Sequence, residues 1–445
     1  MIIRNARIVF PDGIVEGCVQ FDDSAGLIEQ VGKTIGAQGE ETVDAQGAYL
    51  LAGLIDCHTH MRDPGLTAKE DFFTGTTSAL AGGVTTIIDM PNTNPPTTTM
   101  EGLKAKRAEA AKKSACDYAF FFGATNDNHA EAKGALLEKD VAGLKAFMGP
   151  STGRMLLDSP GALLEHLRQA RKPLCIHAED AAVVAFYEER FRNELGDFAG
   201  AEIHNKARPP IAAAAAVQKA LAILGEAKGR HLHVCHASTG EEAGEIRKAK
   251  AGGLHVTAEA APHHLFLTED DARRLGNFAK VNPPLRSADD AAALRQALVE
   301  GVIDCVASDH APHLKAEKDG DYWSAPSGMP GVETMLPLLI NAAAKGELKL
   351  ERIAEACCTS PSRIFALRHK GRIEKGKDAD FVLLTLDGTA VVDGGEMHSK
   401  CGWSAYDGME LRGGILQVYL RGKLVREGNF VVAAAGGGRP AEVVT

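Results

Sequence analysis

The chain has 445 residues and a formal net charge of −10, and 45% of its residues are hydrophobic and 24% charged. This composition is that of an ordinary globular protein, which argues against a fibrous or disordered chain. Because the charge balance is negative and no basic run is present, nucleic acid and anionic membranes are not expected as partners.

The sequence also carries signals of the compartment. No apolar stretch approaches the roughly 20 residues of a membrane-spanning helix, and the N-terminus lacks the apolar core of a signal peptide. Nine cysteines, an odd number without a Cys-x-x-Cys pair, predict reduced thiols rather than a disulfide framework. We therefore expect a cytoplasmic protein.

Both ends of the chain carry short strand-like runs separated by Gly, Asp and Pro turns. These runs predict one small β-sandwich domain built from residues 1–51 and 371–432, beside a larger unit. The last residues, 433–445, lack an apolar pattern, and we expect them to form a loose tail.

Between the two ends, buried strand patterns alternate with amphipathic helix patterns. The expected strands are 54–60, 84–90, 118–123, 143–148, 173–177, 231–235, 254–260 and 303–308. The expected helices include 100–115, 160–171, 211–228, 240–251 and 288–300. Eight such α/β units predict a (β/α)8 TIM-like barrel over residues 52–370, with its active site at the C-terminal ends of the strands.

Side chains of metal-ligand type stand at the ends of several of these strands. His58 and His60 close the first strand, where residues two apart point to the same face. His177, His236 and Asp309 end the fifth, sixth and eighth strands. Four imidazoles and a carboxylate in one bowl are too many for a single tetrahedral ion and suit two. For an isolated His-x-His, a pair of hydrogen-bonded core histidines is the competing interpretation.

Lys145 is the unusual residue of the fourth strand. A charged ammonium at the end of an apolar strand is costly to bury and cannot bind a cation. Burial lowers the pKa of a lysine, and a neutral amine can react with carbon dioxide to give a carbamate, whose two oxygens can bridge two metals. On the strand alone, a lysine that reaches the barrel mouth or pairs with an acid is the simpler interpretation.

Taken together, the motifs resemble those of the amidohydrolase superfamily, and within it those of the class I dihydroorotases, which are cyclic amidohydrolases. The resemblance covers nearly the whole chain. It rests on these segments in this order: Asp56–Gly65, Asp89–Pro96, Lys145–Gly149, His177–Glu179, Cys235–Thr239, Val281–Arg286, Ser308–His313 and Gly371–Asp380.

The resemblance implies a centre of two divalent metal ions, for which Zn²⁺ is the expected metal. Its implied ligands are His58, His60 and Asp309 on one ion, His177 and His236 on the other, and N6-carboxylated Lys145 between them. Many class I dihydroorotases have an aspartate as the bridging ligand, whereas this chain has a lysine in a setting that resembles the carbamate-bearing members.

The same resemblance implies reversible hydrolysis of (S)-dihydroorotate to N-carbamoyl-L-aspartate, a step of de novo pyrimidine synthesis. A metal-bridged hydroxide would attack the ring carbonyl, with Asp309 as proton shuttle. Arg62 would bind the ring carboxylate through its planar fork. Asn92 and His313 would complete that clamp, and Asn282 would contact the ring. A homodimer is expected.

Two other functions compete with this interpretation. A dihydropyrimidinase, hydantoinase or allantoinase would share the fold and the metals, but an uncharged ring offers no carboxylate to Arg62. A catalytically inactive scaffold is the second alternative, and the presence of every ligand type disfavours it. His310 is expected to face away from the bowl in a structural role.

Overall fold

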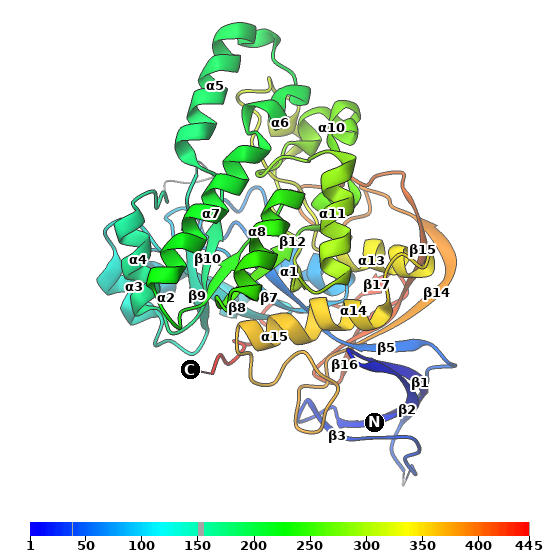
Figure 1. The fold of residues 1–445 in the computed structure, drawn as a ribbon. Helices are drawn as coiled ribbons and strands as arrows, with labels where there is room; N and C mark the ends of the chain where they lie inside the picture. Colours follow the sequence, from blue (N-terminus) through cyan, green and yellow to red (C-terminus); the bar gives the residue numbers. More distant parts are fainter. Residues whose placement is uncertain (38, 150–154, 445) are drawn as a thin grey trace.

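The computed structural model describes residues 1–37, 39–149 and 155–444. Its centre is a parallel eight-stranded sheet in sequential order, curled into a barrel (Figure 1). The strands are β6 (Leu54–Thr59), β7 (Val84–Asp89), β8 (Asp117–Gly123), β9 (Val141–Phe147), β10 (Leu174–His177), β11 (Leu232–Val234), β12 (Val256–Ala260) and β13 (Cys305–Val306). All eight lie within two residues of the strands predicted from the sequence, so the fold class is confirmed.

The barrel closes just beyond its last short strand. Thr59 and His310 form an isolated parallel bridge, and the His60 N–H donates to the His310 carbonyl at 2.8 Å. The buried Asp56 carboxylate accepts the Ser308 N–H at 3.0 Å across the same seam. The first and eighth strand ends are therefore tied together where the predicted ligands stand.

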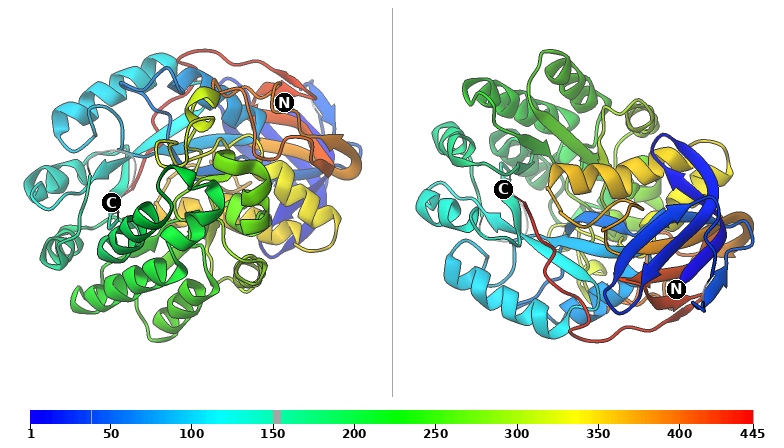
Figure 2. Two further views of the ribbon diagram at one scale, coloured as in Figure 1. Left: turned by 90° about the horizontal axis from the view of Figure 1, so that it is seen from above. Right: turned by 90° about the horizontal axis from the view of Figure 1, so that it is seen from below.

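Helices surround the barrel and rise above its C-terminal mouth, as the views in Figures 1 and 2 show. The outer ring contains α1 (Phe72–Ala81), α2 (Met100–Lys113), α3 (His129–Ala135), α4 (Pro160–Gln169), α7 (Pro210–Glu226), α8 (Gly240–Ala251), α11 (Ala288–Val299) and α13 (Met335–Ala344). Above the mouth or beside it lie α5 (Ala181–Leu195), α6 (His204–Ala207), α9 (Pro262–Phe266), α10 (Glu269–Leu275) and α12 (Lys315–Lys318), and α14 (Leu350–Ala354) and α15 (Ser360–Ile364) follow the last strand.

Local sequence fixes where these helices begin. The Thr239 side chain accepts the Glu242 N–H, and the Glu242 carboxylate accepts the Thr239 N–H, which forms a capping box at the start of α8. The side chains of Asp71, Thr99 and Ser287 each accept one backbone N–H of the first turn of α1, α2 and α11. A cap fixes the residue at which a helix begins. It therefore also fixes where the preceding loop ends, and these loops carry the residues of the site.

The two ends of the chain build a separate mixed sheet of nine strands. It contains β1 (Ile2–Phe10), β2 (Gly13–Asp22), β3 (Leu27–Gly32), β4 (Thr42–Asp44), β5 (Tyr49–Ala52), β14 (Phe381–Val391), β15 (Glu410–Leu420), β16 (Lys423–Glu427) and β17 (Phe430–Val431). Antiparallel pairing of β5 with β14 joins the two halves. This bears out the expectation that both termini contribute to one β unit.

A buried ion cluster links that sheet to the barrel. The Lys370 ammonium lies 2.5 Å from an Asp117 oxygen, 2.8 Å from Asp378 and 2.7 Å from Asp380. Burial alone would lower the pKa of Lys370, but the three carboxylates raise it above its ordinary value. The three acids resemble a metal site in their spacing, yet Lys370, Arg421 and Arg439 already pair with them.

The expected loose tail is wrong for its described residues, 433–444. The Ala441 N–H donates to the Tyr118 carbonyl at 2.8 Å, and the Val443 N–H donates to the Lys139 carbonyl at 2.7 Å. The side chains of Ala441 and Val443 are buried against the apolar cluster that includes Phe365. The tail is therefore held by two small apolar side chains that lie two residues apart in an extended segment. It has no longer hydrophobic pattern that the sequence would show.

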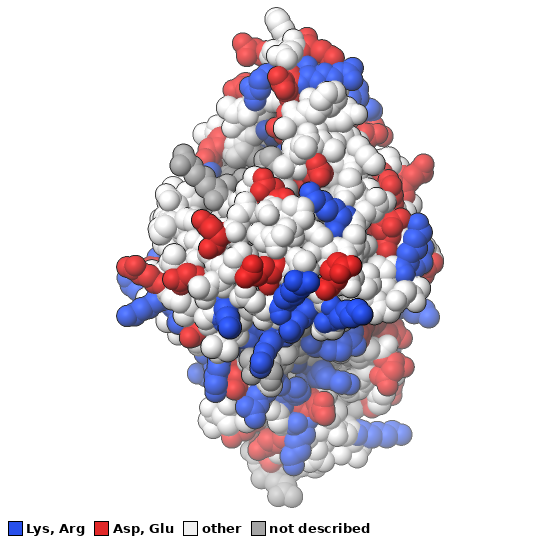
Figure 3. All heavy atoms as spheres, turned by 60° about the vertical axis from the view of Figure 1, so that its left-hand side comes forward, with Lys and Arg blue, Asp and Glu red and all other residues white. Residues whose placement is uncertain are grey.

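The surface carries both signs of charge. On the face drawn in Figure 3, Lys and Arg side chains gather over the lower middle, with Asp and Glu among them. Among the described residues, no helix has the length and apolar character needed to cross a bilayer.

Candidate active site

His58, His60 and Asp309 meet at the mouth of the barrel. Asp309 Oδ1 lies 3.3 Å from Nε2 of His58 and 3.2 Å from Nε2 of His60, and all three side chains are buried. Three residues of the site, Arg62, His236 and Asp309, have positive φ angles of 60°, 32° and 47°. Such left-handed backbone is unfavourable outside glycine and concentrates at functional sites, where it aims a side chain that a regular strand would direct elsewhere.

The other two predicted histidines join this group. His177 Nδ1 and His236 Nε2 lie 3.0 Å apart, and the ring centroids of His58 and His236 are 5.1 Å apart. Burial lowers the pKa of His60 to about 3 and also lowers the pKa of His177 and His236. These three imidazoles are therefore neutral at pH 7, the form in which histidine binds metals.

The donor set fits divalent cations. The donor atoms of His58, His60 and Asp309 lie within 4.8 Å of one another. Burial and Lys145 would lower the pKa of His58, yet the carboxylates of Glu259 and Asp309 raise it to about 10. The raised pKa shows that the surroundings of His58 favour a positive charge. The nitrogen and oxygen donors of this group are those that Zn²⁺ prefers.

Lys145 lies inside the barrel beside these ligands and is fully buried. Its ammonium donates to Cys235 Sγ at 2.9 Å and lies 5.2 Å from the centroid of the Phe147 ring. Burial and the neighbouring His177 lower the pKa of His236 most, and the charge of Lys145 lowers it further. The predicted bridging residue is thus close to the ligand cluster and has no carboxylate within ion-pair distance in the described part of the chain.

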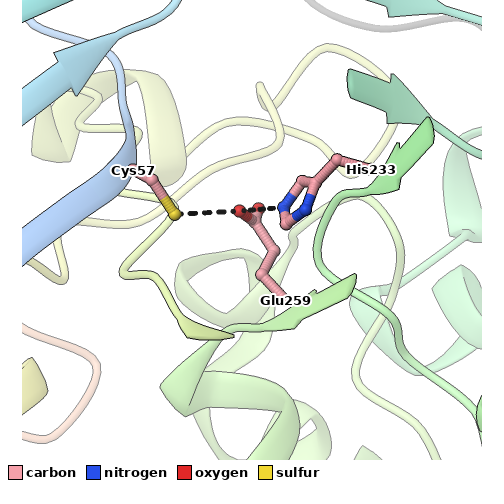
Figure 4. Close-up of side chains that lie close together, drawn as sticks. All are labelled: Cys57, His233 and Glu259. Atoms are coloured by element: carbon pink, nitrogen blue, oxygen red, sulfur yellow. Dashed lines mark hydrogen bonds and ion pairs between the residues drawn. The ribbon is translucent and has the colours of Figure 1, made fainter. Parts of the chain in front are cut away.

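Glu259, at the end of β12, supports the cluster from below and was missed by the sequence analysis. Figure 4 shows its carboxylate between Cys57 and His233, at 3.4 Å from the thiol and 3.1 Å from the ring. The same carboxylate accepts the Nδ1–H of His58 and the backbone N–H of His236. Burial would raise the pKa of Glu259, but His58 and His233 hold it well below its ordinary value.

Glu179 and Arg208 support His177, and neither residue had a role predicted from the sequence. Glu179 accepts the His177 Nε2–H at 3.0 Å, and Arg208 contacts both oxygens of the same carboxylate, with Nη2 at 2.6 Å. This leaves Nδ1 of His177 directed at His236. A glutamate two residues after a strand-end histidine was the available signal for this role.

The residues predicted to bind substrate lie beside the predicted metal ligands. Arg62 is buried, and it donates to the Pro312 carbonyl at 3.2 Å and lies 3.1 Å from His313 Nε2. Its Nη1 has no partner among the described residues. Asn92 accepts from His60 Nδ1 at 2.6 Å, and Asn282 lies 3.0 Å from His204 Nε2.

These side chains line one pocket at the mouth of the barrel. It is lined by His58, His60, Arg62, Asn92, Phe147, His177, His236, Asn282, Asp309, Ala311, Ser327 and Gly328. His313 stands behind Arg62 rather than on the wall. His310 faces away from the pocket and accepts the Gly331 N–H at 3.2 Å, in line with the structural role expected for it.

The chain is similar to known cyclic amide hydrolases of two kinds. Residues 49–425 match the model of the amidohydrolase family. The dihydroorotase of Halobacterium salinarum is 41% identical over 413 residues, which cover 92% of each chain. An L-hydantoinase of Paenarthrobacter aurescens is 32% identical over 99% of this chain and 97% of its own. The solved L-hydantoinase (dihydropyrimidinase) from Arthrobacter aurescens superposes with a TM-score of 0.94 at 31% identity over 99% of both chains.

Proposed function

The chain belongs to the amidohydrolase family, and we propose that it is a dihydroorotase, which interconverts dihydroorotate and N-carbamoyl-aspartate. The observation that carries this proposal is Arg62. Its buried guanidinium lies on the wall of the pocket that contains the metal-ligand cluster, and its Nη1 has no partner among the described residues. A buried cationic donor of this kind is costly unless a ligand completes it.

The ring carboxylate of dihydroorotate is the group that would complete Arg62. An arginine fork binds a carboxylate through two parallel hydrogen bonds, which fix both the position and the orientation of the ring. Asn282, Ser327 and Gly328 line the same pocket and would contact the ring. Relatives named dihydroorotase support this substrate.

His58, His60, His177, His236, Asp309 and N6-carboxylated Lys145 would hold two divalent ions. When bound, such ions polarise a carbonyl and lower the pKa of water toward neutrality. Burial raises the pKa of Asp309, but His58, His60 and His236 hold it well below its ordinary value. Asp309 is therefore ionised at neutral pH, and it would accept the proton of the attacking water and deliver it to the departing ring nitrogen.

The second candidate is a hydantoinase or dihydropyrimidinase. The similarity to the solved L-hydantoinase at a TM-score of 0.94 favours it. Its rings carry no carboxylate at the corresponding place, so the guanidinium of Arg62 would stay without its anionic partner. Substrate preference therefore separates the two candidates.

The decisive experiment compares turnover of dihydroorotate, hydantoin and allantoin by the Zn²⁺-loaded protein. We expect turnover of dihydroorotate alone, and we expect Arg62→Gln to raise its KM about 10- to 100-fold because a charge-assisted pair is lost. Arg247→Gln, which removes an exposed arginine paired with Glu300, is the matched control. Equal turnover of hydantoin, or an unchanged KM in Arg62→Gln, would contradict the proposal.

A further inference from the structure

Beyond the ligands and Arg62, the segment that follows β13 forms part of the pocket wall. Ala311, Ser327 and Gly328 line the pocket. The Ser327 carbonyl lies 3.1 Å from His313 Nε2, the same ring nitrogen that lies 3.1 Å from Arg62. The position of this segment therefore affects the group predicted to bind the carboxylate.

Two buried lysines hold this segment through its backbone. The Lys280 ammonium donates to the carbonyls of Tyr322 and Ala325, both at 2.6 Å. The Lys318 ammonium donates to the carbonyls of Pro326 and Gly328 at 2.9 Å and to that of Lys280 at 3.1 Å. Together they grip four carbonyls within residues 322–328.

Both lysines are buried and bind backbone carbonyls rather than acids. In the residues that the structure describes, neither ammonium has a carboxylate within ion-pair distance. Lys318 is 1% exposed and Lys280 is 8% exposed. Three carbonyls surround Lys318, and only the protonated amine offers three N–H donors. Burial lowers the pKa of Lys280 to about 8 and that of Lys318 well below its ordinary value. The buried carbonyls that the two amines bind require N–H donors, which an apolar side chain cannot supply.

Steric contacts make the segment sensitive to small shifts. Gly328 has a φ of 139°, and a Cβ built there would lie 2.4 Å from the Ala311 carbonyl oxygen and 3.0 Å from Cδ2 of His313. The segment is thus packed directly against the strand-end residues of the pocket. A displacement of residues 322–328 would move His313 and the pocket wall together.

We propose that Lys280 and Lys318 are positioning residues that hold residues 322–328 in the shape required for substrate binding. This inference rests on the proposed function, because it names the side chains that adapt the pocket to a carboxylate-bearing substrate. Both amines stand behind the wall next to Arg62, and Glu317, one residue before Lys318, is paired with Lys69 at 2.7 Å.

The test uses Lys318→Met, Lys280→Gln and the charge-preserving Lys318→Arg in the full-length Zn²⁺-loaded protein. Lys248→Met, at a side chain that is 75% exposed, is the matched control. For Lys318→Met we expect KM for dihydroorotate to rise on the order of tenfold, since small misplacements of binding groups carry large costs. The value of kcat should change less than about threefold, the pattern of lost ground-state binding. Lys318→Arg should recover part of the loss.

Two further measurements separate positioning from general destabilisation. Amide hydrogen exchange should become faster within residues 322–328 and stay unchanged in the barrel strands, and the Zn²⁺ content should equal that of the wild type. If Lys318→Met does not fold, Lys280→Gln carries the same test. An unchanged KM in a folded variant, or faster exchange across the whole barrel, would overturn the inference.

The outcome is distinguishable from failure of the proposed function. If the wild type prefers hydantoin to dihydroorotate, the proposed function fails whatever the variants do. If the wild type prefers dihydroorotate and the lysine variants match it in KM and exchange, only the inference fails.

Discussion

The two walls of the pocket are backed by different kinds of hydrogen-bonding group. The wall of predicted metal ligands consists of imidazoles, two of which are held from behind by carboxylates: Glu259 for His58 and Glu179 for His177. The substrate wall consists of Arg62 and backbone held from behind by ammonium groups, those of Lys280 and Lys318.

The difference agrees with what each wall is proposed to hold. An imidazole that binds a metal through one nitrogen has an N–H on the other, and a carboxylate or amide oxygen is its natural partner. A loop that lines a pocket presents carbonyl oxygens behind it, and N–H donors are their partners. The comparison predicts that damage behind the first wall weakens metal binding, whereas damage behind the second raises KM for substrate.

The largest effect is expected at Lys145, between the two groups of histidines. Lys145→Ala removes the predicted bridge, and activity should fall by more than about 100-fold, because loss of even the partners behind metal ligands costs 10- to 100-fold. Added short carboxylic acids should restore part of the activity by supplying the two missing oxygens. The measurement is dihydroorotate turnover with and without acetate or propionate. Full activity in the variant without any added acid would contradict the predicted bridging role of Lys145.

A smaller effect is expected at Glu259. Glu259→Gln keeps the size of the side chain but replaces one acceptor oxygen by a donor, so the Nδ1–H of His58 loses its charged partner. Zn²⁺ affinity, measured by competition with a chelator, should fall about 10- to 100-fold, with KM for dihydroorotate nearly constant in the fully loaded enzyme.

Glu242→Gln is the matched control for that variant. Glu242 is also a buried carboxylate beside the barrel, but it caps α8 and contacts Ser238 and Thr239 rather than a predicted ligand. It should lower stability without changing Zn²⁺ affinity. Equal loss of affinity in both variants would show that burial of an acid, rather than its contact with His58, matters.

The sequence was sufficient for the barrel and for the residues that meet at its mouth. Strand and helix patterns alternate with regular spacing, and in a parallel barrel every strand end faces the same bowl, so His177 and Asp309 could be placed near His58 although they lie far apart in the chain. The docked tail could not be predicted, because Ala441 and Val443 form no periodic run and are buried only by distant partners.

The groups behind the two walls were hidden for different reasons. Glu259 stands at the end of a barrel strand like the ligands, but its role depends on reaching Nδ1 of His58, which strand order does not reveal. Lys280 and Lys318 bind backbone carbonyls, and every residue type has a backbone carbonyl. The sequence therefore does not show which carbonyls a lysine binds. Charge patterns identify a lysine's acidic partners only where acids are present.

The smallest effect is expected at Arg208, one layer further from the metal ligands. Arg208→Met leaves the contact between Glu179 and His177 intact but removes the fork that fixes the carboxylate, so the ring of His177 should become less ordered. We expect a roughly 3- to 10-fold loss of Zn²⁺ affinity, below that of direct partners, and an unchanged KM in the loaded enzyme. Arg208→Lys, which keeps the charge but not the planar fork, should fall between the variant and the wild type. A rise in KM without loss of Zn²⁺ affinity would show that Arg208 supports the substrate wall instead. The proposed division between the two walls would then be wrong at the residue that follows α6.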